Sequence, residues 1–201
     1  FMKVEGGFLL CSVLPEPSLD YKKIVYMDMD GKICDSYIHT HQFGMTLGKN
    51  FVRRKDGTVF ISTPYSNQIY YWDKERLCEY CYTDFGNLNV PQDGGVDDLS
   101  FYDSDYIHNN NFFVTSSYFI NAFLYDNRMY YHFRENSTGK SYCGLMTDAG
   151  FGVPFFPRWQ HEDYLIGLCR FDELPEMPKM KTGQDIREGM SVLIFKMKGA
   201  M

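Results

Sequence analysis

The sequence lacks any long apolar stretch and any cluster of basic residues. Its longest apolar segment, Phe8–Leu14, is interrupted by Cys11 and Ser12, and it is far shorter than the roughly 18 residues of a membrane-spanning helix. The 20 Lys and Arg residues are outnumbered by 26 Asp and Glu, which gives a net charge of −6. The sequence has no run of basic residues that could follow the phosphate backbone of a nucleic acid. We therefore expect neither a transmembrane segment nor a nucleic-acid partner.

The chain also lacks the motifs of nucleotide and nucleophilic chemistry. No Gly-x-Ser-x-Gly elbow, Walker loop or dinucleotide fingerprint occurs in it. We expect no cofactor, and the sequence leaves catalysis undecided while favouring a protein that is not an enzyme. The first residues contain no charged segment followed by an apolar one, so any export signal would lie upstream of this chain.

The cysteines do not form a metal-binding pattern. Cys78 and Cys81 have the spacing of half a zinc site, but no second pair accompanies them. Residues three apart on a strand also point to opposite faces. The wide spacing and apolar surroundings of the cysteines favour free, buried thiols, with disulfides as the alternative. The six are Cys11, Cys34, Cys78, Cys81, Cys143 and Cys169.

His39 and His41 are a weak candidate pair for a metal. Two residues apart on an extended chain, both imidazoles point to one side. A third ligand is not evident, and the other histidines contribute only if the fold brings them near. Solvated histidines in a surface loop are therefore the favoured interpretation. The other histidines are His108, His132 and His161.

What the sequence does contain is aromatic and apolar residues suited to strands. Aromatic residues make up 17% of the chain, with 16 Tyr and 17 Phe, and 44% of the chain is hydrophobic. Aromatic and β-branched residues favour pleated, half-buried surfaces over helices. The composition therefore predicts a globular, all-β protein with a substantial core.

An aromatic strand that ends in an acidic turn occurs three times. The copies are Ile24–Ile33, Gln68–Leu77 and Arg128–Asn136, and the second follows the first by about 45 residues, the size of a propeller blade. Turn residues set off further strands around each copy. In the second and third units we expect strands at 50–54, 58–62, 68–72, 77–82, 111–116, 118–125, 128–133 and 141–146.

Several of these strands are apolar on both faces, as in Val59–Ile61 and Phe119–Leu124. A parallel sheet covered by helices would explain this, but no amphipathic helical segment lies between the strands. Stacked, four-stranded antiparallel blades fit better. The last unit, with strands predicted at Tyr164–Cys169 and Ser191–Lys198 and a helical turn at Gln184–Glu188, is one strand short. In a closed propeller the N-terminal segment often supplies that strand.

Several segments resemble a known family of propellers. They are Tyr80–Pro91 after Tyr71-Trp72-Asp73, Asp56–Ile61, Tyr164–Leu168 and Met190–Lys198. Together they resemble the six-bladed, NHL-like β-propellers of secreted proteins and lipoproteins of gut bacteria, whose function is unknown. The resemblance implies a periplasmic, cell-surface or secreted location and carries no catalytic residue to this chain.

The resemblance also implies that the chain is the C-terminal portion of one propeller domain. Residues 1–201 then form about four of six blades, near residues 1–41, 49–86, 101–146 and 150–198. N-terminal blades or a second copy of the chain would close the ring. A self-contained, four-bladed propeller of the hemopexin type is the alternative.

Four residues are candidates for ligand binding. Arg53 and Arg54 lie near a predicted innermost strand and could line the central channel. Arg158 and Trp159 lie beside the prolines of residues 154–157, which predict an irregular surface segment. We expect a non-catalytic binding or scaffold propeller that engages a glycan, peptide or protein partner. The alternative is a glycan-active hydrolase or lyase, which would need several carboxylates or three metal ligands at the channel.

Overall fold

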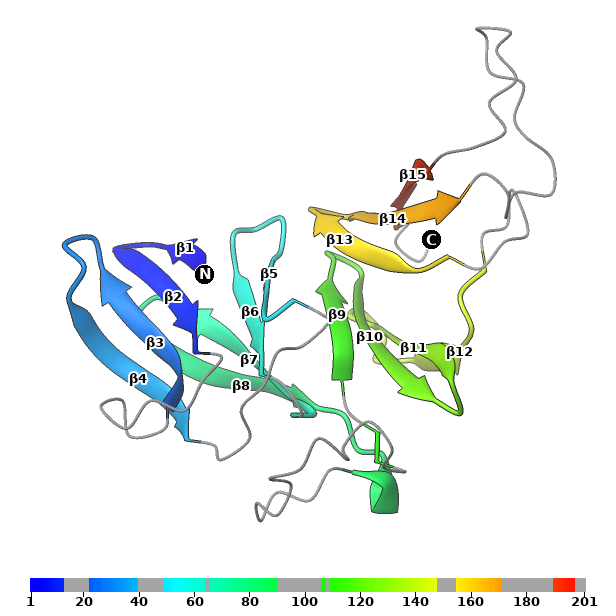
Figure 1. Ribbon diagram of the computed structural model, residues 1–201, viewed down its shortest axis with the longest axis horizontal. Coiled ribbons are helices and arrows are strands. Elements are labelled where there is room, and N and C mark those ends of the chain that lie inside the picture. The colour runs from blue at the N-terminus through cyan, green and yellow to red at the C-terminus, as the bar shows by residue number, and fades with distance from the viewer. Residues whose placement is uncertain are drawn as a thin grey trace, which may run out of the picture.

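Four antiparallel sheets follow one another along the chain in the computed structural model (Figure 1). The structure describes residues 1–12, 22–39, 49–63, 66–89, 106–107, 109–147, 155–170 and 190–197. Within these ranges each sheet is built from consecutive strands, and every pair of neighbouring strands is antiparallel. The predicted all-β class of four-stranded antiparallel sheets is confirmed.

The first two sheets have four strands each. The strands are β1 (Met2–Val4), β2 (Gly7–Cys11), β3 (Lys22–Asp28), β4 (Ile33–His39), β5 (Phe51–Arg53), β6 (Val59–Ser62), β7 (Gln68–Asp73) and β8 (Arg76–Tyr82). A single turn of 3-10 helix, η2 (Gly86–Leu88), comes shortly after β8.

The third sheet has four strands, and the described part of the fourth has three. The strands are β9 (Asn109–Val114), β10 (Tyr118–Tyr125), β11 (Arg128–Glu135), β12 (Ser141–Gly144), β13 (Pro157–His161), β14 (Tyr164–Arg170) and β15 (Met190–Lys196). The helical turn expected at residues 184–188 lies outside the described residues.

Tight turns connect many of these strands, as their sequences predict. Asp126 and Asn127 join β10 to β11 with φ of 48° and 54°, and two positive φ values in a two-residue hairpin are the signature of a type I′ turn. Between β3 and β4, Gly31 has a φ of 84°, and Asp28 Oδ1 accepts hydrogen bonds from the amides of Asp30 at 3.0 Å and Lys32 at 2.9 Å. Such turns fix which strands become neighbours.

A separate apolar core fills each space between consecutive sheets. Val4, Leu9 and Ile24 of the first sheet pack with Val59 and Ile61 of β6. Phe60, which lies between these two on β6, points the other way and packs against the third sheet. The strand β6 is therefore buried on both faces, which is the reason that its sequence does not alternate between apolar and polar residues.

The sheets form an arc, with the first strand of each sheet toward its inner side (Figure 1). β5 and β9, the first strands of the second and third sheets, contact each other. The outermost strands β4, β8 and β12 lie on the far side of the arc. This is the arrangement of consecutive blades, and it brings residues from distant first strands into one region.

The prolines near residues 154–157 predict an irregular segment beside Arg158 and Trp159. Pro154 lies outside the described residues, and Phe155 and Phe156 belong to no strand. The strand β13 begins at Pro157 and includes both Arg158 and Trp159. Proline is tolerated at the first residue of a strand, because the strand can begin there without its amide hydrogen. A register irregularity between Pro157 and Trp159 marks the same place.

Candidate functional site

A pocket of about 340 Å³ lies where the first strands of the first, second and fourth sheets approach one another. We call it the axial pocket, because it lies among the innermost strands. It is lined by Met2, Lys49, Phe51, Val52, Arg53, Arg54, Lys55, Gly57, Gln160, His161 and Glu162.

The short strand β5 and the turn after it supply most of the basic side chains. Val52 is buried, so its neighbour Arg53 points to the opposite face of the strand. The chain then turns back, with the Gly57 amide bonding the Arg54 carbonyl at 2.9 Å and the Arg54 amide bonding the Thr58 carbonyl at 2.9 Å. Gly57 has a φ of 90°, which glycine adopts without strain. This tight turn holds Arg54 and Lys55 at the pocket.

The two arginines expected at the channel have different local partners. The Arg53 guanidinium donates to the carbonyl oxygen of Lys3 and lies 3.4 Å from the Met2 sulfur, so it connects the first strands of the first two sheets. The Arg54 guanidinium pairs with Asp56 at 2.6 Å and lies 5.2 Å from the ring centre of Phe60. Both therefore line the pocket with part of the guanidinium already engaged.

The pocket is electropositive. Lys49, Arg53, Arg54 and Lys55 face a single acidic lining residue, Glu162. Lys49 is half-buried, and this burial lowers the pKa of its ammonium group. A charge in such a place acts more strongly on a ligand than a fully solvated one. The pocket therefore favours an anionic group.

The Arg54–Asp56 pair is electrostatically coupled. The hydrogen bond from Arg54 lowers the pKa of Asp56 to about 2. The same bond raises the pKa of Arg54. Asp56 is therefore ionised at neutral pH and offsets part of the positive charge of Arg54, so Lys49, Arg53 and Lys55 contribute most of the uncompensated charge.

Gln160 joins the fourth sheet to the third beside the pocket. Its carboxamide accepts from the Val114 amide at 2.8 Å and donates to the Val114 carbonyl at 2.6 Å. Asp163, in the following turn, accepts from the amide and hydroxyl of Ser116 at 2.7 and 3.2 Å. The sequence gives no sign of these contacts, because side chain to backbone bonds between positions 46 or 47 apart have no local pattern.

Arg158 and Trp159 do not line the axial pocket, although the next two residues of β13 do. The register places Trp159 opposite Ile166, and Ile166 opposite Ile194. These three residues form an apolar row across the fourth sheet, on the face that is turned away from the third sheet. Trp159 is 41% exposed and Ile194 62% exposed. The structure therefore separates this pair from Arg53 and Arg54.

The histidines do not converge. His39 is exposed at the end of β4, while His41 and His108 lie outside the described residues. His161 lines the axial pocket, and His132 lines another. In the described ranges no group of three His, Cys, Asp or Glu side chains could hold a metal ion.

The cysteines correct two expectations. The thiols of Cys11, Cys34, Cys78, Cys81 and Cys143 are free, but Cys34 and Cys143 are exposed where burial was predicted. In addition, Cys78 lies opposite Tyr71 and Cys81 opposite Ile69, two residues of one face of β7. A bulge inserts one extra residue into β8, so two positions three apart share a face instead of alternating.

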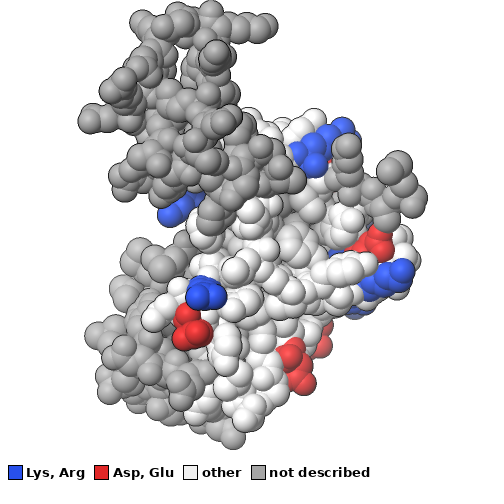
Figure 2. Space-filling view, turned by 90° about the vertical axis from the view of Figure 1, so that its right-hand side faces the viewer, with Lys and Arg blue, Asp and Glu red and all other residues white. Residues whose placement is uncertain are grey.

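The alternative of a hydrolase or lyase calls for converging carboxylates. Among the described residues, Glu162 is the one carboxylate that lines the axial pocket. Figure 2 shows one face of the molecule on which basic and acidic side chains form small separate groups on a mostly uncharged surface. The described lining of the axial pocket therefore contains no pair of carboxylates.

Fold and site together define a protein of consecutive, blade-like antiparallel sheets with a basic pocket at their inner edge. Among solved structures, the chain is similar to a Bacteroides fragilis protein named "Putative exported protein", with a TM-score of 0.63 and 18% identity. The match covers 82% of this chain and 51% of that one, so this chain spans about half the length of its structural relative. The likeness shows the fold alone.

No family model matches the chain, and no curated protein matches it. The NHL-like, six-bladed propeller family and the number of blades therefore stay predictions. Within the described residues, no helix is long and apolar enough to cross a membrane.

Proposed function

We propose that this chain is part of a non-catalytic binding or scaffold propeller that holds an anionic ligand in the axial pocket. The observation that carries the proposal is the grouping of Lys49, Arg53, Arg54 and Lys55 around one pocket with a single acidic lining residue. Guanidinium and ammonium groups form strong, charge-assisted hydrogen bonds with carboxylates. The ligand is a glycan, peptide or protein segment that presents a carboxylate.

The size of the pocket supports this ligand class. Its volume of about 340 Å³ lies at the lower end of the range of small-ligand pockets, roughly 300–1,000 Å³. One acidic sugar or one acidic side chain fits this space, with the remainder of a larger ligand outside. Met2 and Phe51 supply apolar lining.

We also propose that the protein acts outside the cytoplasm, in the periplasm, at the cell surface or as a secreted protein. Its structural relative is named as an exported protein. The resemblance to secreted proteins and lipoproteins supports the same location. A carboxylate-bearing glycan would be encountered there.

We further propose that another blade-like sheet covers the exposed apolar row of the fourth sheet. Trp159 and Ile194 have the same apolar character as the residues that pack between the described sheets. A sheet supplied by N-terminal blades or by a second copy would bury them in the same way and complete the ring.

Binding to arrayed glycans and acidic peptides tests the role of the pocket. We expect uronate- or sialate-bearing glycans, or Asp- and Glu-rich peptides, to bind more tightly than their neutral counterparts. We expect Lys49→Gln with Lys55→Gln to reduce that binding about tenfold or more, because two charge-assisted contacts are lost. Lys140→Gln, on the turn between β11 and β12, is the matched control. Equal binding of neutral ligands, or an unchanged affinity in the double variant, would contradict the proposal.

A further inference from the structure

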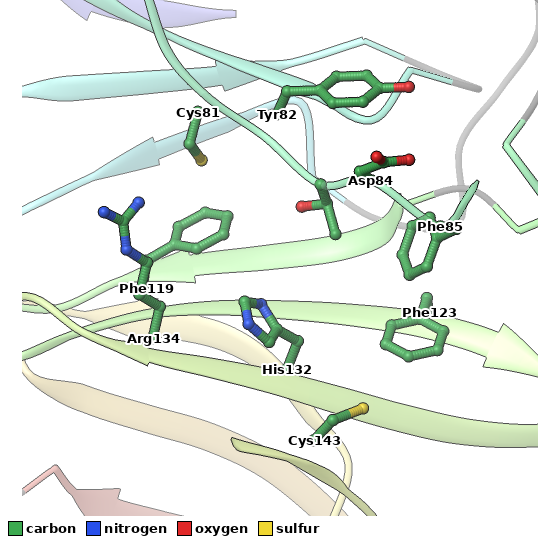
Figure 3. Close-up of a pocket in the computed structure, with 10 residues that line it drawn as sticks. Cys81, Tyr82, Asp84, Phe85, Phe119, Phe123, His132, Arg134 and Cys143 are labelled. Carbon is green, nitrogen blue, oxygen red and sulfur yellow. The ribbon is translucent and has the colours of Figure 1, made fainter. Parts of the chain in front are cut away.

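A second pocket, of about 300 Å³, lies between the second and third sheets (Figure 3). We call it the intersheet pocket. The strand register explains its composition, because Arg134 lies opposite Phe119, and His132 lies opposite both Asn121 and Cys143. These residues share one face of the third sheet. Phe119 belongs to the core between the sheets, and the pocket opens where that core ends.

The two ends of the intersheet pocket differ in chemistry. Figure 3 shows the Arg134 guanidinium near Phe119 at one end, the rings of Phe85 and Phe123 at the other, and His132 between them. The Phe85 and Phe123 rings lie 4.9 Å apart between centroids. Phe85 follows β8, and Phe123 lies on β10, so the aromatic end joins both sheets.

The polar end has unused binding capacity. Arg134 is exposed, and among the described residues none forms an ion pair or hydrogen bond with its guanidinium. The buried Nδ1 of His132 has no hydrogen-bond partner there. Burial, and then the charge of Arg134, lowers the pKa of His132. Burial also raises the pKa of Cys81 to about 11. At neutral pH the imidazole and the thiol are therefore uncharged, and the guanidinium is the charge at this end.

The aromatic end carries a fixed negative charge. Asp84 Oδ1 accepts hydrogen bonds from the Gly86 amide at 2.8 Å and from Asn89 Nδ2 at 2.6 Å. These bonds lower the pKa of Asp84, so its carboxylate is ionised. A ligand anion is repelled from this end and attracted to Arg134, which gives a bound molecule one orientation.

We propose that the intersheet pocket binds a small carboxylate with an apolar body, such as an aryl-alkanoate. The carboxylate pairs with Arg134 and accepts a hydrogen bond from the His132 imidazole, and the apolar body packs against Phe119 and the Phe85–Phe123 pair. This binding site is separate from the axial pocket and does not depend on the function proposed for it.

Protection of a pocket thiol from alkylation tests this assignment with an internal control. Cys143 is exposed and lines the intersheet pocket, whereas Cys34 is exposed on β4 of the first sheet. We expect 3-phenylpropionate to slow the reaction of iodoacetamide with Cys143 at least threefold and to leave Cys34 unchanged, as read by peptide mass spectrometry. We expect 3-phenylpropanol, which lacks the charge, and acetate, which lacks the ring, to protect Cys143 much less.

Two arginine variants complete the test. Arg134→Gln is expected to weaken 3-phenylpropionate binding, measured by titration calorimetry, by about tenfold or more, because the charge-assisted contact is lost. Arg128→Gln, on the same strand and outside the pocket, is expected to bind as the unchanged protein does. Unchanged thermal unfolding of both variants shows that folding is intact. Equal protection by 3-phenylpropanol, no protection by 3-phenylpropionate, or full affinity in Arg134→Gln would overturn the proposal.

Discussion

At the scale of single residues, the side chains that matter most are those that bond across sheets. Arg53 bonds the backbone of the first sheet, and Gln160 bonds that of the third. Arg53 was predictable as a pocket residue, because it lies on the innermost strand of its sheet beside the apolar Val52, and adjacent residues of a strand point to opposite faces. Gln160 was not predictable, because its partner lies 46 residues away and a glutamine within a strand has no distinguishing sequence pattern.

The Arg54–Asp56 pair makes a specific prediction about pH. Asp56 has a folded-state pKa of about 2, below its ordinary value, so the pair stabilises the folded state above about pH 4 and loses this effect as the pH falls toward 2. Both side chains are partly solvated, so the contribution is small. We expect the difference in unfolding free energy between the unchanged protein and Asp56→Asn, from urea titrations, to be constant above pH 5 and to shrink below pH 4.

Asparagine is the suitable replacement because its carbonyl oxygen can keep the hydrogen bond that Asp56 accepts from the Thr58 amide at 3.1 Å. As a control, Arg54→Gln in the Asp56→Asn background should add no further pH dependence in this range. A difference between Asp56→Asn and the unchanged protein that stays constant down to pH 2 would show that folding does not lower the pKa of Asp56.

At the scale of elements, the sequence predicts strands best where a hairpin turn sits between two apolar runs. The strand β10 has the predicted bounds of Tyr118–Tyr125 because Asp126-Asn127 ends it sharply. The strand β13 is not evident from the sequence, because the prolines at and before its first residue indicate irregular backbone. The face shared by Cys78 and Cys81 was missed because a bulge depends on pairing with β7, which the sequence of β8 alone does not show.

The packing of β14 against the segment before β13 gives a stability prediction. A Cβ atom added at Gly167 would lie 2.5 Å from the Phe155 ring and 2.9 Å from the Phe156 carbonyl oxygen. Phe155 is buried in the core between the third and fourth sheets and packs on Phe195, with ring centres 4.4 Å apart. We expect Gly167→Ala to lower the unfolding free energy by about 1–3 kcal/mol in urea titrations, because the ring must move.

Gly144→Ala is the matched control for this substitution. Gly144 ends a strand of the third sheet, and an added Cβ atom there meets nothing within 4 Å. We expect this variant to unfold within about 0.5 kcal/mol of the unchanged protein. If Gly167→Ala and Gly144→Ala changed the unfolding free energy equally, the close approach of Phe155 to Gly167 would not limit stability.

At the scale of the whole molecule, the fourth sheet presents an apolar face that no described residue covers. Val192 and Ile194 are 60% and 62% exposed on β15, and Trp159 lies on the same face. Large exposed apolar surfaces favour association. We expect the 201-residue chain to self-associate with increasing concentration, as measured by light scattering after size exclusion.

Charge placed on that face should reduce the association. Ile194→Lys is expected to shift the protein toward the monomer, whereas Leu124→Lys, at a comparably exposed position on the third sheet, is expected to have little effect. A monomeric chain at all concentrations, or equal effects of the two lysine substitutions on association, would show that no further sheet packs on this face.

The axial pocket takes its lining from both ends of the arc, with Met2 of the first sheet and Gln160 of the fourth. The apolar cores, in contrast, each join only consecutive sheets. The width of the pocket is therefore set by the curvature of the arc. A molecule bound there would contact both the first and the fourth sheet, which share no apolar core. A change in the curvature of the arc would therefore change both the width of the axial pocket and its affinity for that molecule.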